Sequence, residues 1–296
     1  MRRLVILVSG AVLFFMSFSV SAQDQKKESL VMDDIYVRET MPQRIPVPYP
    51  YLRESDMMWT KVVWRIIDLR EKINHPLYYP TQLMQDRVSF LQRLVDAIKY
   101  NEISAYDPAV DDEFTTLLSY NQVLQNFDAL DKSKTQQSLF SGLDTTVTVK
   151  GEVRWMDVKE LLVKEKWFFD KNYSTLQVRI IGICPIRHSF RTLQTGGGEE
   201  EATGELTRTR LFWIYFPEAR KVLANTAVFN TFNDAQRISF DDLFFKRYFN
   251  SYIVQESNVY NNRRIQEYTY GGVPNQQESD RIKNDIFTFE HDLWEY

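Results

Sequence analysis

The sequence predicts an α+β protein in which an antiparallel-rich sheet packs against several helices, with an extended N-terminal arm and a C-terminal helix. Apolar residues make up 44% of the 296 residues, which is the composition of a globular protein. β-rich apolar runs and segments with helical spacing both occur, but they do not alternate in regular βαβ order. A proline-rich stretch precedes these segments, and an amphipathic segment follows them.

Residues 1–22 are expected to be a signal peptide that is removed from the mature protein. Arg2 and Arg3 precede an apolar run over 4–20, and the sequence VSA at 20–22 offers small residues for cleavage. The alternative is an uncleaved membrane anchor, for which the run is short. We therefore expect an exported protein, without a lipid anchor of its own because no cysteine lies near the cleavage point.

The charge balance argues against one class of partner. The chain has 36 basic and 40 acidic residues, so its formal net charge is −4. A nucleic-acid-binding protein needs a surplus of basic side chains on some face to neutralise phosphates. We therefore expect no nucleic-acid partner.

Residues 23–53 are predicted to form an extended, proline-rich arm. Proline fixes φ and pushes the preceding residue toward extended conformations, so this stretch is neither a helix nor a central strand. Such an arm lies on something, either its own domain or a neighbouring subunit, and the sequence leaves both open. The prolines are Pro42, Pro46, Pro48 and Pro50.

A core domain is predicted over residues 54–270. Its strands are predicted from the residue composition of each segment. Residues 55–72 fit both a helical and a strand pattern, and their density of Val, Ile and Trp favours a strand. The prediction for this segment is a short helix followed by a strand. A turn is predicted at 217–220. Further strands are predicted at 145–149, near 175–184, near 209–216 and at 222–229.

The predicted helices come from apolar spacing and from capping patterns. Residues 87–99 and 112–127 carry apolar residues at helical intervals. Asp157 with Glu160 predicts a helix over 158–166, and Ser239 with Asp242 predicts one over 243–249. The last predicted unit, 271–296, is a linker followed by an amphipathic helix that starts near Asn275.

The search for catalytic or metal-binding motifs yields no candidate. His75, His188 and His291 form no HExxH pair, and P-loop, dinucleotide and catalytic-serine motifs are absent. Cys184 is expected to be a small buried hydrophobe, although a nucleophilic role beside His188 stays open. The Gly/Glu-rich loop at 194–207 is expected to be a solvated hairpin tip. The sequence thus predicts no catalytic, cofactor-binding or metal-binding residue.

Five long strings of the sequence resemble one family. They run over 44–59, 65–80, 163–186, 212–230 and 239–263, and include RIIDLREKINHPLYYP, VKEKWFFDKNYSTLQVRIIGICPI and SFDDLFFKRYFNSYIVQESNVYNNR. The strings resemble the GldN/PorN family of gliding-motility proteins. The resemblance extends over most of the chain, from about residue 33 to residue 270.

The resemblance implies a non-enzymatic structural component of a periplasmic ring, associated with the outer membrane, in the type IX secretion and gliding-motility machinery. It implies assembly with the lipoprotein GldK/PorK and with further copies of the chain, and contact with the periplasmic part of the motor protein GldM/PorM. Membrane contact would then occur only through partners, and no cofactor is implied. The alternative is a secreted hydrolase or surface-binding protein without a role in a machine.

Five residues of the arm and the first strand are predicted to bind partners. A ring requires heterologous interfaces, in which one patch binds a different patch on the next copy. An extended proline-rich segment loses little entropy on docking, and Tyr and Trp suit surfaces that are half apolar and half wet. The predicted residues are Pro46, Pro48, Tyr49, Tyr51 and Trp59.

Overall fold

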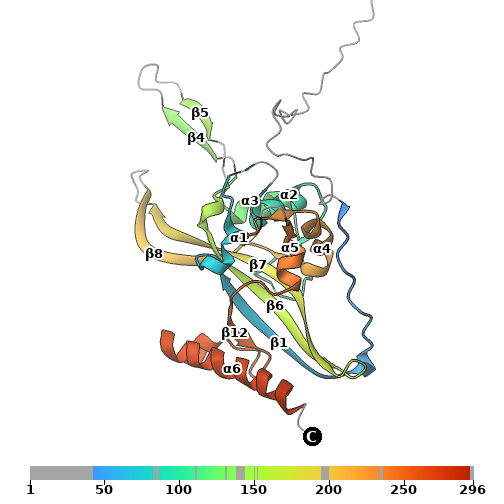
Figure 1. Ribbon diagram of the computed structural model, residues 1–296. Coiled ribbons are helices and arrows are strands. Elements are labelled where there is room, and N and C mark those ends of the chain that lie inside the picture. Colours follow the sequence, from blue (N-terminus) through green and yellow to red (C-terminus); the bar gives the residue numbers. More distant parts are fainter. Residues whose placement is uncertain are drawn as a thin grey trace, which may run out of the picture. The chain divides into compact units, whose positions relative to one another are not determined.

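The computed structural model contains an eight-stranded sheet in the order β12–β1–β6–β7–β9–β2–β3, with β8 paired to β7 (Figure 1). Every pairing between its strands is antiparallel, which confirms the predicted α+β class. The described residues are 43–293 except 83, 85, 86, 111, 131, 138–143, 150, 152, 195–199, 232, 234 and 235. The expected signal peptide and the start of the arm lie outside this range.

Three long neighbouring strands form the centre of the sheet: β1 (Met57–Asp68), β6 (Val158–Asp170) and β7 (Thr175–Gln194). β7 continues past its pairing with Val158 of β6 and pairs there with β8 (Glu200–Arg210). The remaining strands of the sheet are β2 (Ala105–Tyr106), β3 (Leu117–Leu118), β9 (Trp213–Tyr215) and β12 (Tyr252–Glu256). Two separate hairpin pairs are β4 (Lys132–Gln137) with β5 (Asp144–Val149), and β10 (Ala227–Val228) with β11 (Ile238–Ser239).

Five helices gather at one end of the long strands, and α6 (Gly272–Asp292) packs on β12 and the other end of β1 (Figure 1). Helices α2, α3 and α5 each begin with a reciprocal capping box, in which a serine side chain and the residue three positions later satisfy free backbone N–H groups. The five helices are α1 (His75–Tyr78), α2 (Phe90–Lys99), α3 (Tyr120–Asn126), α4 (Phe216–Ala224) and α5 (Phe240–Phe245). Single 3₁₀ turns lie at Glu54–Asp56, Lys72–Asn74, Trp155–Asp157 and Ile265–Glu267.

The main core lies between the five helices and one face of the sheet. Phe90 of α2 packs against Phe240 and Phe244 of α5, with ring centroids 5.4 and 5.2 Å apart. Residues alternate between the two faces of a strand, so Ile67 of β1 joins this core while its neighbour Ile66 points to the other face. That other face carries a smaller cluster of Trp64, Ile66, Leu162, Cys184, Ile186 and Trp213.

The strongest electrostatic link between two helices is buried. Arg220 of α4 donates to both carboxylate oxygens of Asp241 in α5, at 2.7 and 3.1 Å. The side chains are only 5% and 8% exposed. A bidentate pair of this kind compensates the desolvation of both charges and fixes the position of α5 against α4.

Several predicted elements are confirmed. The helix predicted at 87–99 is α2, the strand at 145–149 is β5, and the C-terminal helix is α6, which starts at Gly272 rather than near Asn275. Gly271 precedes it with φ 100°, a conformation that favours glycine. In residues 55–72 the strand is confirmed as β1, while the predicted helix is one 3₁₀ turn. The predicted strands near 175–184 and 209–216 and the helix at 243–249 correspond to β7, β9 and α5 with shifted ends.

Three predicted elements are wrong. Residues 158–166 belong to strand β6, because pairing with β1 on one side and β7 on the other overrides their helix-favouring Lys, Glu and Leu content. The turn predicted at 217–220 and the start of the strand predicted at 222–229 form helix α4, whose first turn accommodates Pro217, and only 227–228 of that strand form, as β10. Only 120–126 of the helix predicted at 112–127 forms.

The reason for the shortened helix is a residue with positive φ. Phe114 has φ 63°, which is incompatible with a helix. Its ring lies so close to Gly182 of β7 that a Cβ atom there would collide with it. Phe114 therefore packs on the sheet instead of continuing the helix. Of the hairpin tip predicted at 194–207, residues 195–199 lie outside the described residues, and 200–207 are not loop but part of strand β8, paired with β7.

Removing the guanidinium of the buried pair should destabilise the protein strongly. Arg220→Met leaves the Asp241 carboxylate buried without its cation, so we expect the free energy of unfolding to fall by about 3–5 kcal/mol. Chemical denaturation followed by circular dichroism measures this loss. The matched control is Arg281→Met, because Arg281 pairs with Glu278 and Asp285 at the surface of α6. The control substitution should lower the free energy of unfolding by less than about 1 kcal/mol. Equal losses in the two variants would contradict the conclusion that the buried Arg220–Asp241 pair holds the helices together.

Candidate interaction surfaces

The described part of the arm, residues 43–53, lies on its own domain. Arg44 Nη1 is 2.6 Å from Asp242 Oδ2, and Arg179 Nη2 donates to the carbonyl of Pro50 at 2.7 Å. These contacts reach α5 and β7. Of the two arrangements that the sequence left open, the structure therefore has the arm packed on its own chain.

Tyr49 is the central contact of the arm. Its ring stacks on Phe245 with centroids 6.3 Å apart, and the guanidinium of Arg220 lies 4.3 Å from the ring centroid. Burial raises the pKa of the Tyr49 hydroxyl, an effect that the positive charges of Arg220 and Arg179 oppose. The ring therefore covers the buried Arg220–Asp241 pair and ties the arm to it.

A carboxylate at the start of α5 holds the other end of the described arm. Burial alone would raise the pKa of Asp242, but hydrogen bonds from Ser239 and the charge of Arg44 outweigh it, so the pKa lies below its ordinary value. A lowered pKa means that ionised Asp242 contributes stability at neutral pH, and that this contribution is lost as the pH falls through the lowered pKa.

The opposite side of the arm faces outward and is apolar. Ile45 is 87% exposed and Tyr51 is 85% exposed, and Val47 between them is also exposed. Such a row of apolar side chains on an extended segment is unusual for a surface that contacts only water. Of the predicted partner-binding residues, Tyr51 and Pro48 are exposed, whereas Pro46 and Tyr49 are half-buried.

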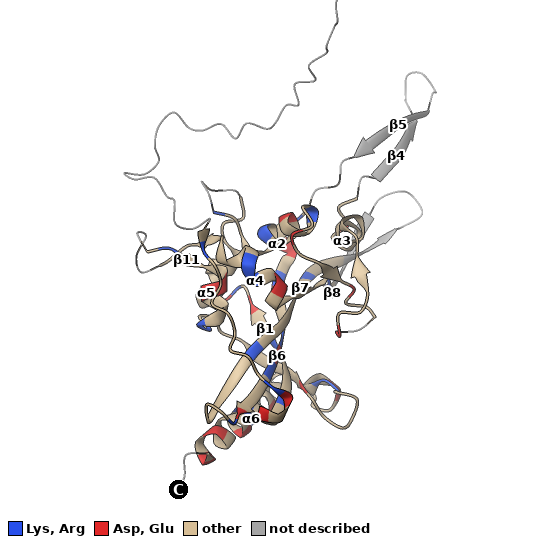
Figure 2. Cartoon of the chain, turned by 90° about the vertical axis from the view of Figure 1, so that its right-hand side faces the viewer, with Lys and Arg blue, Asp and Glu red and all other residues tan. Residues whose placement is uncertain are grey.

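Trp59, the fifth predicted residue, contacts α6 and not the arm. Its indole stacks on Phe289 with ring centroids 4.5 Å apart. At a different point along α6, Ser279 accepts a hydrogen bond from the backbone N–H of Ile253 in β12 at 2.9 Å. The structure therefore gives Trp59 an intramolecular contact that positions α6. Acidic and basic residues both occur along α6 (Figure 2), and the side chains of Arg281 and Asp285 are about half exposed.

Three carboxylates are buried in strand β6, and two of them, Glu160 and Glu165, lie beside basic side chains of other elements. Glu160, 1% exposed, lies 3.3 Å from His188 Nε2 and 3.4 Å from Arg208. Glu165 is 2.9 Å from Arg247 Nη1 and also accepts a hydrogen bond from Trp167 Nε1. These groups link β6 to β7, to β8 and to the segment after α5. They therefore serve the packing of the sheet.

An apolar groove of about 610 Å³ lies beside α1. Its exposed apolar side chains are Tyr79, Met84 and Phe229, and the guanidinium of Arg87 lies 5.3 Å from the ring of Phe229. No sequence pattern predicted this groove, because its residues come from two segments separated by about half of the chain.

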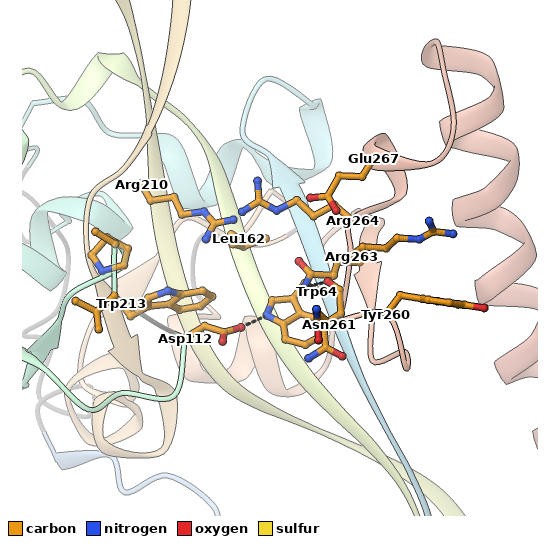
Figure 3. A pocket seen from close by; sticks show the side chains of 15 residues that line it. Trp64, Asp112, Leu162, Arg210, Trp213, Tyr260, Asn261, Arg263, Arg264 and Glu267 are labelled. Atoms are coloured by element: carbon orange, nitrogen blue, oxygen red, sulfur yellow. Dashed lines mark hydrogen bonds between the residues drawn. The ribbon is translucent and has the colours of Figure 1, made fainter.

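A second cavity, of about 620 Å³, is polar and lies on the other face of the sheet (Figure 3). We call it the arginine cavity. It was also missed from the sequence, because β1, β8, β9 and the segment before α6 each contribute to it. Its lining includes Trp64, Asp112, Arg210, Trp213, Tyr260, Arg263, Arg264 and Glu267.

Comparison with known proteins decides the family. The family model described as "Gliding motility associated protein GldN" matches residues 52–295. The chain belongs to the GldN family. A search of curated proteins finds no match. The resemblance seen in the sequence strings is thereby confirmed, and membership in the GldN family gives the chain a role in gliding motility and type IX secretion.

The matched range includes most of the surfaces described above, but not the outward side of the arm. It covers Trp59, the apolar groove and the arginine cavity, and it begins just after Tyr51. The outward side of the arm therefore lies before the range that defines the GldN family.

The cysteine that the sequence left open as a nucleophile has an unsuitable environment. Cys184 is completely buried in β7, and its Sγ donates to the carbonyl of Pro185 at 3.6 Å. Burial raises the pKa of the thiol to about 12. Within the described ranges no group of three or more His, Cys, Asp and Glu residues could hold a metal ion. No helix of the described part is long and apolar enough to cross a membrane.

The thiol of Cys184 should therefore be inert in the folded protein. At pH 8 we expect no reaction of the native chain with Ellman's reagent, because a pKa of about 12 leaves almost no thiolate. The same thiol should react fully in denaturant, where its pKa returns to its ordinary value. Rapid labelling of the native protein would show that this strand opens or that the thiol is accessible.

Proposed function

We propose that the chain is a non-enzymatic structural component of a periplasmic ring, associated with the outer membrane, in the type IX secretion machinery. Its partners in this proposal are a GldK/PorK-type lipoprotein, further copies of itself and the periplasmic part of a GldM/PorM-type motor protein. Membership in the GldN family over residues 52–295 is the observation that carries the proposal. The expected signal peptide supports the location outside the cytoplasm.

The surfaces of the molecule support assembly into a ring. A heterologous interface needs two different patches on each copy. The outward side of the arm offers Ile45, Val47 and Tyr51, and the apolar groove offers Tyr79 and Phe229 on a different part of the chain. Each patch contains a tyrosine beside aliphatic or aromatic side chains, which is typical of interface cores.

The buried charged side chains pair with other parts of the fold, which supports a structural role. Glu160 lies beside Arg208 of β8, Glu165 pairs with Arg247 after α5, and Arg220 pairs with Asp241 between two helices. None of these groups is directed at an open site with a nucleophile beside it. The charges therefore support a scaffold more than a hydrolase.

Fractionation tests the proposed location and assembly. A tagged full-length chain, expressed in a cell that contains the type IX machinery, should sediment with outer-membrane material in a large complex. Pull-down from detergent extracts should recover the GldK/PorK-type lipoprotein and untagged copies of the chain. Recovery as a free monomer in the medium would overturn the proposal and would favour a secreted hydrolase or surface-binding protein.

Substitution on the outward side of the arm tests its part in the assembly. The double variant Ile45→Ser/Tyr51→Ser removes two apolar side chains that are 87% and 85% exposed, so folding should be unchanged. We expect at least about tenfold less recovery of untagged copies or of the lipoprotein in the pull-down, since interface tyrosines often dominate binding.

The matched control is Tyr270→Ser/Val273→Ser, which removes two similarly exposed apolar residues near the start of α6. The control should assemble as the parent does. If the arm variant also assembles normally, the arm has no role in assembly, and the apolar groove would be the next surface to change.

A further inference from the structure

The arginine cavity contains two cationic side chains that face each other. Arg210 at the end of β8 and Arg264 before α6 extend toward one another across the cavity, above Leu162 of β6 (Figure 3). Trp64 of β1 and Trp213 of β9 line the wall beneath them. The cavity thus has an aromatic wall with two guanidinium groups above it.

Neither of these arginine side chains forms a close ion pair or a side-chain hydrogen bond among the described residues. The nearest acidic influence on Arg210 is the charge of Asp112, which favours its charged form only weakly. Burial lowers the pKa of Arg210, and the positive charge of Arg264 lowers it further. Two like charges held together, one of them half-buried, are unfavourable unless an anion joins them.

Among the carboxylates of the cavity, Asp112 favours the charged form of Arg210, but less than burial and Arg264 oppose it. Asp112 accepts a hydrogen bond from Trp64 Nε1 at 2.6 Å and lies 3.5 Å from Lys164 Nζ, so it is already engaged. Glu267 lines the same cavity without forming an ion pair with either arginine. A third cation, Arg263, stacks on Tyr260 and Tyr268 at the rim. Positive charge therefore exceeds negative charge here, in a chain whose formal net charge is −4.

The rim of the cavity is held in place before any ligand binds. Asn261 and Asn262 have φ of 56° and 54°, a conformation that asparagine tolerates in tight turns. The side chain of Asn262 accepts a hydrogen bond from the backbone N–H of Asn258 at 3.0 Å, and Gln255 of β12 donates to the Asn262 carbonyl. Such a pre-organised rim lowers the entropy lost on binding.

We propose that the arginine cavity binds a carboxylate carried on an acidic segment of a partner protein. Paired guanidinium groups suit a carboxylate because each can donate two parallel N–H bonds to its oxygens. A protein segment is favoured because Trp, Tyr and Arg together are the residues that dominate protein interfaces, and Tyr260 is exposed at the rim. A cavity of about 620 Å³ also exceeds the space that a single small anion fills.

Peptide binding tests this proposal independently of the ring. The probe is a fluorescein-labelled peptide Gly-Glu-Glu-Phe-Glu-Gly, and the matched control peptide has Gln in place of each Glu. We expect fluorescence anisotropy with the purified full chain at low salt to show binding of the acidic peptide only. Equal binding of both peptides, or binding of neither, would overturn the proposal.

Variants of the chain locate the binding site. Arg264→Met lies at the exposed rim and should weaken peptide binding by about tenfold or more without altering the thermal melting curve. Arg210→Lys keeps the charge but loses the bidentate geometry, so it should weaken binding to a smaller extent. The matched control Arg281→Met removes one charge from the outer face of α6 and should bind as the parent does.

Two results would overturn the assignment of the site. One is a loss of binding in Arg281→Met equal to the loss in Arg264→Met, which would indicate attraction to overall charge alone. The other is competition by inorganic phosphate at concentrations at which acetate and glutarate have no effect. Phosphate competition of that kind would show that the cavity serves a phosphate ligand instead of a carboxylate on a protein.

Discussion

Burying the carboxylates of Glu160 and Glu165 in β6 constrains the rest of the sheet. The desolvation of each charge costs several kcal/mol and is offset only if a cation reaches it with good geometry. Glu160 lies beside His188 of β7 and the guanidinium of Arg208 in β8, and Glu165 lies beside Arg247 from the segment after α5. A slip of one residue in the pairing of β6 would turn each carboxylate to the opposite face of the sheet, away from these partners.

The irregular positions in the pairing of β6 with β7 fit this constraint. The register shifts between Val158 and Glu160, and again between Lys164 and Glu165. A β-bulge turns the side chains near it and increases the local twist. Both shifts adjoin a buried carboxylate. The charge pairs therefore lie where the pairing of the two strands is irregular.

The sequence predicts those elements whose signals are local. Ser89 with Gln92 and the spacing of apolar residues fix α2, and Ile282 and Ile286 mark the buried side of α6. Strand β6 could not be predicted, because its Lys and Glu residues resemble a helix surface and their partners lie far away in sequence. Helix α4 was missed because Pro217 reads as a turn, although proline fits the first turn of a helix.

The surfaces, too, could be predicted from the sequence only where their signal is local. The proline spacing predicts an extended arm, and it also directs attention to Tyr49 and Tyr51. Which tyrosine faces the domain depends on Arg220 and Phe245, about 170 and 200 residues away, so the sequence could not distinguish them. The arginine cavity had no sequence signal at all, because Trp64, Arg210 and Arg264 become neighbours only when the sheet is complete.

The strand order has a consequence for how the chain acquires its structure over time. β1 lies between β6 and β12, so residues 57–68 have no sheet partner until residues 158–170 and 252–256 are present. Closing such long loops is entropically costly, and proteins dominated by distant pairings fold slowly. In a chain made N-terminus first, β1 therefore stays unpaired until β6 has followed, and its second partner, β12, comes only near the C-terminal end. The sheet is completed late, when most of the chain is present, so its assembly is expected to be slow.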